Sequence, residues 1–345
     1  MTTCEPQPVV NFSTPTTMGC GHFPNEGSEP FQVLALDGGG FRGLFSAVVL
    51  AKWEQQLGRP ISQHFDLIVG TSTGAIIALG LAAGMSAADL VAFYEKDGKE
   101  IFPARWSVGR VWYGMLHYLH RKYGSSALER ALKRRFGELT ISDLVKPVVI
   151  PGFNLEAGRH WYFKTPHFGA NLIDRYRPLW EVARATSAAP TYFPAFRTSE
   201  NELFVDGGLV ANNPSLVGYF EVALNFPAYR DRIKVLNIGT DGGECALPKR
   251  RLATGGLLSW AKKAPGALMQ AQAVSTEALM AKLLGADRWL RVKPEHGRNF
   301  APLDIYDPVL YSGLAVNQAA RHFADADRLF FQHTAREGLI QHKTK

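Results

Sequence analysis

Cysteine is scarce in this chain, and long hydrophobic runs are absent. Its 345 residues include three cysteines, Cys4, Cys20 and Cys245, which are too scattered for a framework of paired disulfides. No segment reaches the roughly 18–20 apolar residues that a membrane-spanning helix needs. The longest candidate, Gly74–Met85, is too short and indicates a buried helix. We therefore expect unpaired thiols and no transmembrane helix.

The N-terminal segment Met1–Pro30 is rich in proline, threonine, glycine and asparagine and has no hydrophobic period. We expect it to be a tail or a peripheral arm. It lacks the basic and then apolar layout of a secretory signal, so a cytoplasmic protein is expected. Cys20 and His22 hint at metal ligation, but two such residues fall short of a tetrahedral set. No other cluster has ligand spacing, so we expect no metal and no cofactor.

The net charge of +7 concerns partners more than fold. A basic chain favours anionic surfaces, which include lipid headgroups, nucleotides and nucleic acid. No recognisable nucleic-acid-binding module accompanies the charge. We therefore expect no nucleic-acid partner.

Apolar runs alternate with segments of helical spacing, a pattern that favours a parallel sheet covered by helices on both faces. The expected strands are Phe31–Leu36, Phe65–Val69, Pro147–Asn154, Leu203–Val205, Ile233–Ile238 and Trp289–Val292. The expected helices are Leu44–Leu57, Ala75–Ala83, Ala87–Glu95, Pro178–Thr186, Pro214–Ala223, Gly266–Leu284 and Leu314–Phe331. Without repeats or a clear linker, residues 31–345 are expected to form one domain, with a motif-bearing core at about 31–238 and a C-terminal helical extension at about 239–345.

A glycine-rich stretch, Asp37–Gly43 (DGGGFRG), lies between the first expected strand and the first expected helix. Its letters satisfy the G-x-G-x-x-G pattern of dinucleotide-binding loops. Two features argue against that function. Asp37 would place a carboxylate beside a pyrophosphate, and the second strand ends in Gly70 and Ser72 rather than in the acidic residue that binds the ribose. A non-enzymatic nucleotide-binding module is kept as an alternative.

The second motif, Gly70–Gly74 (GTSTG), lies between an expected strand and a helix of small residues. This context is typical of a nucleophile elbow, in which a sharp turn projects a serine hydroxyl above the sheet edge. The positive end of the following helix, with its free N–H groups, favours negative charge near Ser72. We therefore expect Ser72 to be a nucleophile, held in an elbow formed by Gly70, Thr71, Thr73 and Gly74.

The glycine stretch and the elbow fit one reaction, acyl transfer. In that reaction a nucleophile attacks, and hydrogen-bond donors must point at the oxyanion of the tetrahedral intermediate. A glycine loop at a helix start can supply backbone N–H groups that no side chain obstructs. Gly39 and Gly40 are the expected main donors of an oxyanion hole formed by Gly38, Gly39, Gly40, Arg42 and Gly43. Arg42 would hold a lipid phosphate, reinforce this hole or form a structural ion pair.

The third motif, Asp206-Gly207-Gly208, follows the short apolar run Leu203–Val205. In isolation this motif predicts only a turn. A serine hydroxyl needs a base, however, and an aspartate that ends a strand lies where the carboxyl edge of a sheet gathers catalytic groups. The other two motifs therefore make Asp206 the expected proton acceptor.

In this order, the three motifs resemble those of the patatin-like phospholipases. The stretch Ala185–Pro194 (ATSAAPTYFP) also resembles the family's sequence before its catalytic aspartate, and the resemblance runs from about Phe31 to Ile238. It implies a three-layer α/β/α fold with a central, mostly parallel sheet. It also implies a Ser–Asp dyad without a histidine, Ser72 as nucleophile and Asp206 as proton acceptor, and hydrolysis of membrane phospholipid acyl esters through an acyl-enzyme.

A more particular resemblance, to bacterial patatin-like effectors of antiphage signalling, rests on the compact length and on Ala267–Pro294. It implies activation by a cyclic dinucleotide. Such activation is expected to involve a change of assembly, such as a homo-oligomer, or the ordering of a loop over Ser72. It also implies a cytoplasmic protein that contacts the membrane surface transiently when active.

Two further alternatives concern residues outside the motifs. The order Ser72, Asp206, His296 would suit a Ser–His–Asp esterase of small soluble esters, whereas the family pattern makes His296 a surface residue. The stretch Arg105–Lys122 mixes aromatic and cationic side chains. An interfacial helix has this composition, and so does a cap helix packed on the core.

Overall fold

One eight-stranded sheet runs through the residues that the computed structural model describes, which are 29–103, 123–167, 173–241, 264–295 and 304–340. The strand order is β5-β6-β3-β2-β1-β7-β8, and β4 pairs with β3. The strands are β1 (Phe31–Leu36), β2 (Leu67–Gly70), β3 (Val148–Asn154), β4 (Arg159–Lys164), β5 (Phe196–Arg197), β6 (Leu203–Asp206), β7 (Ile233–Ile238) and β8 (Trp289–Val292). Pairs among β3, β2, β1, β7 and β8 are parallel, whereas β4 and β6 pair with β3, and β5 with β6, in antiparallel fashion.

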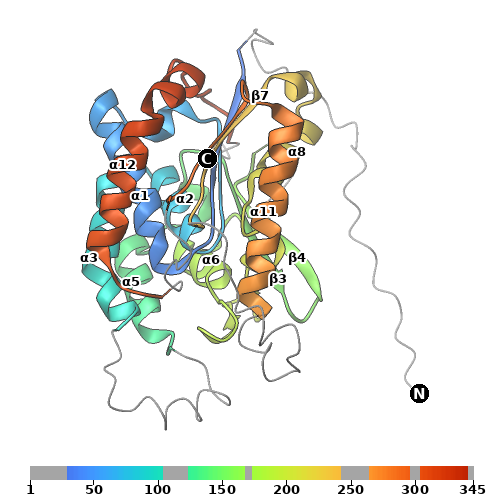
Figure 1. The fold of residues 1–345 in the computed structure, drawn as a ribbon. Coiled ribbons are helices and arrows are strands. Elements are labelled where there is room, and N and C mark those ends of the chain that lie inside the picture. The colour runs from blue at the N-terminus through green and yellow to red at the C-terminus, as the bar shows by residue number, and fades with distance from the viewer. Residues whose placement is uncertain (1–28, 104–122, 168–172, 242–263, 296–303, 341–345) are drawn as a thin grey trace, which may run out of the picture.

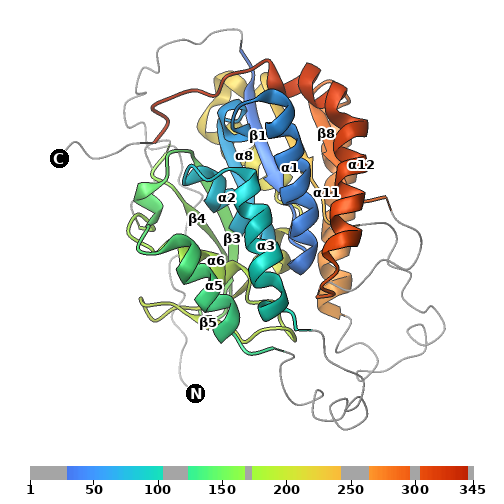
Figure 2. The same cartoon turned by 90° about the vertical axis from the view of Figure 1, so that its left-hand side faces the viewer.

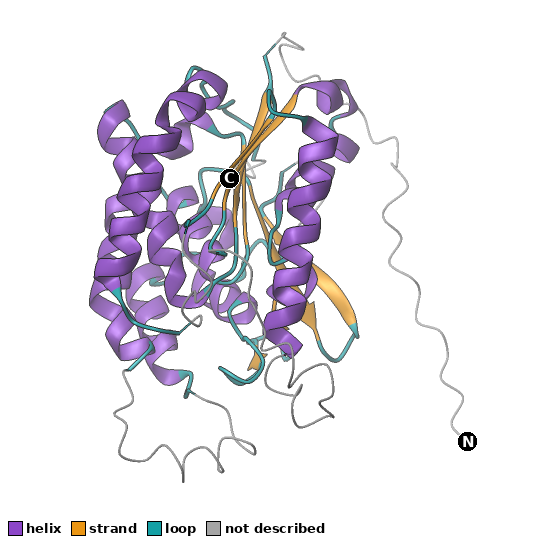
Figure 3. Ribbon diagram, viewed as in Figure 1, coloured by secondary structure: helices purple, strands orange, loops and turns teal. Residues whose placement is uncertain are grey.

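Helices cover both faces of this sheet and give the molecule three layers (Figure 1). One face carries α1 (Gly43–Leu57), α2 (Thr73–Ala82), α3 (Ala87–Ile101), α5 (Ser126–Phe136), α6 (Leu179–Thr186) and α12 (Pro308–Ala326). The other face carries α8 (Ser215–Asn225) and α11 (Ala264–Leu284). Figure 2 looks onto the larger helical layer, and Figure 3 shows the strands between the two layers. The expected three-layer fold with a mostly parallel sheet is confirmed.

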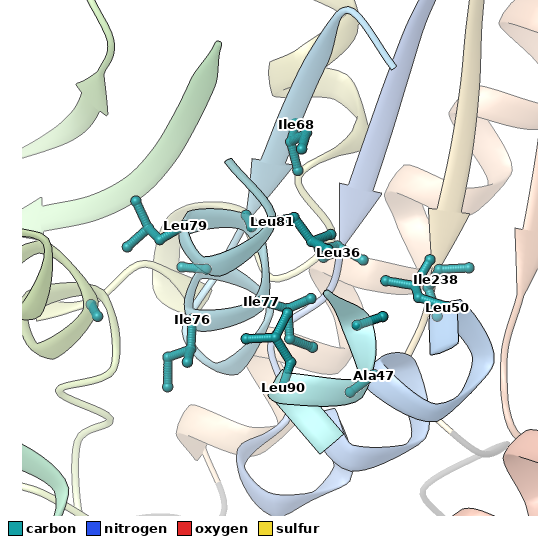
Figure 4. Packing of buried hydrophobic residues seen from close by; sticks show 14 of the residues in the cluster. Leu36, Ala47, Leu50, Ile68, Ile76, Ile77, Leu79, Leu81, Leu90 and Ile238 are labelled. Carbon is teal, nitrogen blue, oxygen red and sulfur yellow. The ribbon is translucent and has the colours of Figure 1, made fainter. Parts of the chain in front are cut away.

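The central strand β1 is apolar at nearly every position because both of its faces are covered. Successive side chains of a strand point to opposite faces. Leu34 and Leu36 therefore pack under α1 and α2, whereas Val33 and Ala35 pack under α8. Figure 4 shows Leu36 near Leu81 of α2, with Ile68 of the neighbouring strand and other apolar side chains of α1 and α2 in the same cluster. This double coverage buries the strand that precedes the glycine stretch on both of its faces.

Every expected strand and helix occurs. The strands β1, β7 and β8 have the expected bounds, and the other elements have shifted ends. The helix expected from Ala87 to Glu95 continues to Ile101, and the helix expected over Leu314–Phe331 begins at Pro308 and ends in a π-helical turn at Asp327–Phe331. The strands β4 and β5, the helix α5 and the short helix α7 (Gly208–Ala211) were not expected. β8, α11 and α12, which come from the expected C-terminal extension, join the sheet and its two helical layers.

Several expectations concern residues outside the described ranges. They are the segment before residue 29, the three cysteines, the whole stretch Arg105–Lys122, and His296. Within the described ranges, no helix combines the length and the apolar composition that crossing a membrane requires.

The register of the parallel strands brings the first two motifs to one edge. Leu36, the last residue of β1, pairs with Gly70 in β2 and with Ile238 in β7. The three strands therefore end at the same height. The glycine stretch after β1 and the elbow after β2 leave the sheet as neighbours, and the Thr71 N–H donates to the Leu36 carbonyl at 3.1 Å.

The third motif reaches the same edge from the opposite direction. Val149 of β3 pairs with Val69 of β2, and Gly152, three residues further along β3, pairs with Asp206 of β6. Asp206 therefore lies at the height at which Ser72 follows β2. The sequence-based expectation placed Asp206 at the end of a strand, which is confirmed, but β6 runs antiparallel to β3.

Candidate active site

Ser72 occupies a sharp turn between β2 and α2. Its backbone has φ 52° and ψ −118°, a combination that residues with a side chain rarely adopt and that costs on the order of 1–3 kcal/mol. The Ser72 N–H donates to the Thr186 hydroxyl at 3.1 Å, and that hydroxyl donates to the Pro151 carbonyl at 2.6 Å. Thr186 thus holds the turn from the side of β3 and α6.

The two glycines of the elbow allow the helix to begin directly against the strands. A Cβ on Gly70 would lie 2.6 Å from the Gly74 carbonyl carbon, and a Cβ on Gly74 would lie 2.7 Å from the Asp37 carbonyl oxygen. Real Cβ atoms do not approach backbone atoms so closely. The close approach of α2 to β1 and β2 therefore requires glycine at both positions.

Ser72 and Asp206 are joined directly. The Ser72 hydroxyl donates to Asp206 Oδ2 at 2.8 Å, and Asp206 Oδ1 accepts from the Gly208 N–H at 2.6 Å. The aspartate is 1% exposed and Ser72 is 9% exposed. The Asp206 and Gly207 N–H groups donate to the Ala188 and Thr186 carbonyls, each at 3.1 Å. The stretch around Thr186 therefore positions both members of the pair.

Burial raises the pKa of Asp206 to about 7, and the hydrogen bonds from Gly208 and Ser72 and the charge of Arg184 oppose that rise. A carboxyl group with this pKa can exchange a proton near neutral pH, which is what an efficient general base requires. The Asp206 environment therefore suits a group that takes a proton from a serine hydroxyl and returns it.

Two of the glycines expected in the oxyanion hole have N–H groups that are already engaged. The Gly38 N–H donates to the Asn212 carbonyl at 3.0 Å, and the Gly43 N–H donates to the carbonyls of Gly40 and Phe41. A Cβ on Gly43 would lie 2.7 Å from the Tyr94 hydroxyl. These two positions therefore serve loop anchoring and helix packing.

The remaining two glycines have N–H groups that are available. Among the described residues, the N–H groups of Gly39 and Gly40 donate no hydrogen bond. Gly40 has φ 59°, a left-handed conformation that favours glycine. Both Nε and the N–H of Arg42 donate to the Gly39 carbonyl, at 3.3 and 3.2 Å. Since C=O and N–H point in opposite directions across a trans peptide, Arg42 fixes the direction of the Gly40 N–H.

Asp37, the first residue of the glycine stretch, is not available to a ligand. Its carboxylate lies 2.9 Å from the Arg291 guanidinium and accepts from the Asn237 side chain at 2.8 Å. Burial raises the pKa of Asp37 to about 6, although Arg291 counteracts the rise. Through this buried ion pair, Asp37 anchors the glycine loop to β7 and β8. Because the carboxylate is engaged there, the geometry argues against the nucleotide-binding alternative.

Among the residues that support the site, sequence reasoning missed Thr186, Arg291 and Tyr94. Thr186 was noticed only as part of a family-like stretch. Arg291 had a signal, because it is the one charged residue in the apolar strand β8. Tyr94, whose hydroxyl donates to the Thr73 carbonyl at 3.0 Å, lies on a helix with an ordinary amphipathic pattern and gave no signal.

A histidine at the site was an alternative, and among the described residues none has its ring hydrogen-bonded to either member of the pair. Asp206 is satisfied there by Ser72 and Gly208. His296 lies outside the described residues. The geometry that is described is thus that of a serine paired directly with an aspartate.

Comparison with known proteins identifies the family of this chain. The family profile described as Patatin-like phospholipase matches residues 34–217, more than half of the chain. Proteins named cGAMP-activated phospholipase are 46% identical over 215 residues in Pseudomonas aeruginosa, 42% over 229 in Escherichia coli and 40% over 241 in Vibrio cholerae. These matches cover 62%, 63% and 64% of this chain, in the same order. They cover 63%, 64% and 67% of the respective relatives. The match to the first two relatives therefore spans less than two thirds of their length. The chain belongs to the patatin-like phospholipase family.

Proposed function

We propose that this protein hydrolyses acyl esters of membrane phospholipids and that a cyclic dinucleotide activates it. The observation that carries the first part is the 2.8 Å hydrogen bond from the Ser72 hydroxyl to Asp206 on a strained elbow. Family membership supports it as well. The names of the bacterial relatives support the second part.

The chemistry follows from the positions of the two side chains. Ser72 Oγ forms a bond to the ester carbonyl carbon while its proton passes to Asp206 Oδ2. The carbonyl oxygen becomes an oxyanion, which the Gly39 and Gly40 N–H groups stabilise. Asp206 then protonates the departing alcohol, which leaves an acyl-serine. Water, deprotonated by the same aspartate, attacks the acyl-serine and releases the fatty acid and free Ser72.

A pairing without histidine is chemically adequate because Asp206 is buried. An exposed carboxylate would have too low a pKa to accept a serine proton efficiently. Burial raises the Asp206 pKa to about 7, the range in which histidine usually acts. Asp206 therefore takes the role that an imidazole has in a triad.

We further propose that the activator is cGAMP, the ligand in the names of the three relatives. The net charge of +7 is compatible with an anionic activator and with anionic membrane surfaces. A ligand activates only if it binds the active arrangement more tightly than the resting one. Activation would then involve a homo-oligomer or a rearrangement near Ser72, together with transient contact with the membrane.

The direct test measures fatty acid release from phospholipid vesicles by the full chain, with and without cGAMP. We expect cGAMP to raise the rate of the wild-type protein and to have no effect on Ser72→Ala. Light scattering after size-exclusion chromatography, with and without cGAMP, tests the change of assembly. A fast wild-type rate that cGAMP does not alter would remove the activation and leave the hydrolysis.

The esterase alternative differs in substrate and in residues. A Ser–His–Asp esterase of soluble esters would hydrolyse a short-chain ester far faster than vesicles and would depend on His296. The phospholipase hypothesis predicts that His296→Ala keeps most of the vesicle activity. A loss of several orders of magnitude in His296→Ala would support the triad instead.

A further inference from the structure

Thr240 lies against the glycine loop and has no role in the chemistry described above. It follows β7 by two residues and is 1% exposed. Its hydroxyl donates to the Gly38 carbonyl. A Cβ on Gly39 would lie 2.6 Å from Thr240 Cβ and 3.0 Å from its Cγ2. Thr240 therefore touches the loop at the peptide bond between Gly38 and Gly39.

Holding this carbonyl also sets the direction of the next N–H. The peptide between Gly38 and Gly39 is trans, since the described residues contain no cis peptide. In a planar trans peptide the C=O and the following N–H point in opposite directions. With the Gly38 oxygen held by Thr240, the Gly39 N–H points away from Thr240 and from β7.

The glycine loop also lies against the elbow that carries the nucleophile. A Cβ on Gly38 would lie 3.5 Å from Ser72 Cβ, so the loop and the elbow are in contact. The Gly39 N–H donates no hydrogen bond among the described residues. An available donor beside the nucleophile is what an oxyanion requires.

The loop is anchored on both sides of this peptide. Before it, the Asp37 carboxylate is held by Arg291 and by Asn237 of β7. After it, Arg42 holds the Gly39 carbonyl. Thr240 supplies the anchor between these two, and a preorganised donor costs no rearrangement when the charge develops.

We propose that Thr240 is a positioning residue of the oxyanion hole, whose hydroxyl holds the Gly38 carbonyl so that the Gly39 N–H faces the oxyanion formed at Ser72. This inference rests on the proposed hydrolytic function. Thr240 touches no reacting atom, so its effect passes through the loop.

The test compares Thr240→Val, which keeps the shape and removes the hydroxyl, with Thr240→Ser, which keeps the hydroxyl. The substrate is a soluble p-nitrophenyl ester of a short fatty acid, hydrolysed by the full chain. A misdirected donor costs less than a lost donor, so we expect Thr240→Val to lower kcat about 10-fold. Because the oxyanion exists only beyond the ground state, KM should stay within about twofold. Thr240→Ser should restore most of kcat.

Thr198→Val is the matched control, because Thr198 is a buried threonine whose hydroxyl bonds backbone atoms of Glu202 in the turn between β5 and β6. It should keep the wild-type kcat. Thermal unfolding of all three variants separates a local effect from a loss of folded protein.

A tetrahedral inhibitor provides a second measurement. A trifluoromethyl ketone forms a hemiketal with a catalytic serine, and its oxygen occupies the oxyanion hole. Thr240→Val should weaken its binding by the same factor of about 10 by which kcat falls. An unchanged kcat and unchanged inhibitor affinity in folded Thr240→Val would overturn the inference, and so would a Thr240→Ser variant as slow as Thr240→Val. If Ser72→Ala still hydrolyses the ester, the proposed function itself fails.

Discussion

A buried aspartate lies at each edge of the central sheet, and the two carboxylates differ in the groups that surround them. At the amino edge, Asp66 accepts hydrogen bonds from the N–H groups of Gln32 and Arg336, at 2.8 and 2.7 Å, and from the Arg336 guanidinium at 2.9 Å. Its Oδ2 also lies 3.1 Å from the His333 ring. At the carboxyl edge, Asp206 accepts only from Ser72 and Gly208 among the described residues.

The difference separates a structural carboxylate from a reactive one. Asp66 has a cation and several hydrogen-bond donors around it, so its negative charge is compensated. Its contacts hold the segment around Arg336 at the amino edge of the sheet. Within the part of the chain that the structure describes, Asp206 has two neutral donors and no ion pair, and burial raises its pKa to about 7. Incomplete compensation destabilises the charged form and leaves the group ready to take up a proton.

The largest expected effect is the loss of hydrolysis in Asp206→Asn. The amide keeps the size of the carboxyl and can still accept from Gly208, but it cannot accept the serine proton. We expect kcat to fall by about 10⁴-fold. Combining Asp206→Asn with Ser72→Ala should add little, because residues that act as one unit lose activity together. Circular dichroism should show an unchanged fold, and substantial remaining activity would exclude the pair.

The next effect concerns the glycine loop. Gly39→Val would overlap with Thr240, and Gly40→Val would place a branched side chain at φ 59°. Either change should displace an N–H donor and lower kcat by roughly 10²–10³-fold. Gly58→Val is the control, since Gly58 also has a positive φ, 67°, but open space around it at the end of α1. It should lose stability while keeping kcat, and unchanged kinetics in both loop variants would place the donors elsewhere.

At the other edge, Asp66→Asn should affect stability rather than chemistry. It leaves Arg336 and its neighbours without their counter-charge. Because Arg336 is partly exposed, we expect a loss near the lower end for a broken buried pair, about 3 kcal/mol. Denaturant unfolding measures it, and ester hydrolysis per folded molecule should match the wild type. A selective loss of kcat would mean that the two edges are coupled.

Much of this arrangement could be predicted because it depends on local patterns. The apolar runs of β1, β2 and β7 and the glycines of both turns determine which strands are buried and where the chain turns sharply. The β4 hairpin was missed because its residues, Arg159–Lys164, are partly exposed and polar in part. As an edge element it lacks a continuous apolar run.

The supporting contacts of the site could not be predicted, since they join residues far apart in the sequence. Thr240 and Arg291 reach the glycine loop across 202 residues or more, because β1 pairs with β7 and β7 pairs with β8. The periodicity of apolar residues predicts which face of an element a residue occupies, but it does not predict which distant residue the side chain contacts. The antiparallel direction of β6 also depends on pairing rather than on the composition of the strand.

The pH dependence of hydrolysis tests the raised pKa of Asp206 at the carboxyl edge. The proton acceptor must be ionised, so kcat/KM should rise about tenfold per pH unit below the Asp206 pKa of about 7 and level off above it. The soluble ester is the suitable substrate, because vesicle surfaces also titrate. Asp37, with a pKa of about 6, is the competing group. Asp37→Asn should keep the midpoint near 7, and a midpoint that moves in this variant would assign the profile to the loop anchor.

The smallest expected effect is a gain of stability in Asp206→Asn. The folded-state pKa of Asp206, about 7, lies above its ordinary value of 3.8. Below that ordinary value the carboxyl is neutral in both states and costs nothing. As pH rises towards 7, the Asp206 carboxyl ionises first in the unfolded chain, so the folded protein loses stability, and above pH 7 the loss is constant.

The asparagine of Asp206→Asn carries no charge to desolvate. It should therefore raise the thermal midpoint at about pH 8 by a few degrees, equivalent to about 1–2 kcal/mol, and should have little effect at about pH 4. Ser72→Ala, which keeps the carboxylate, should show no such pH-dependent gain. An Asp206→Asn protein that is less stable than wild type at both pH values would show that the carboxylate is compensated after all, as Asp66 is.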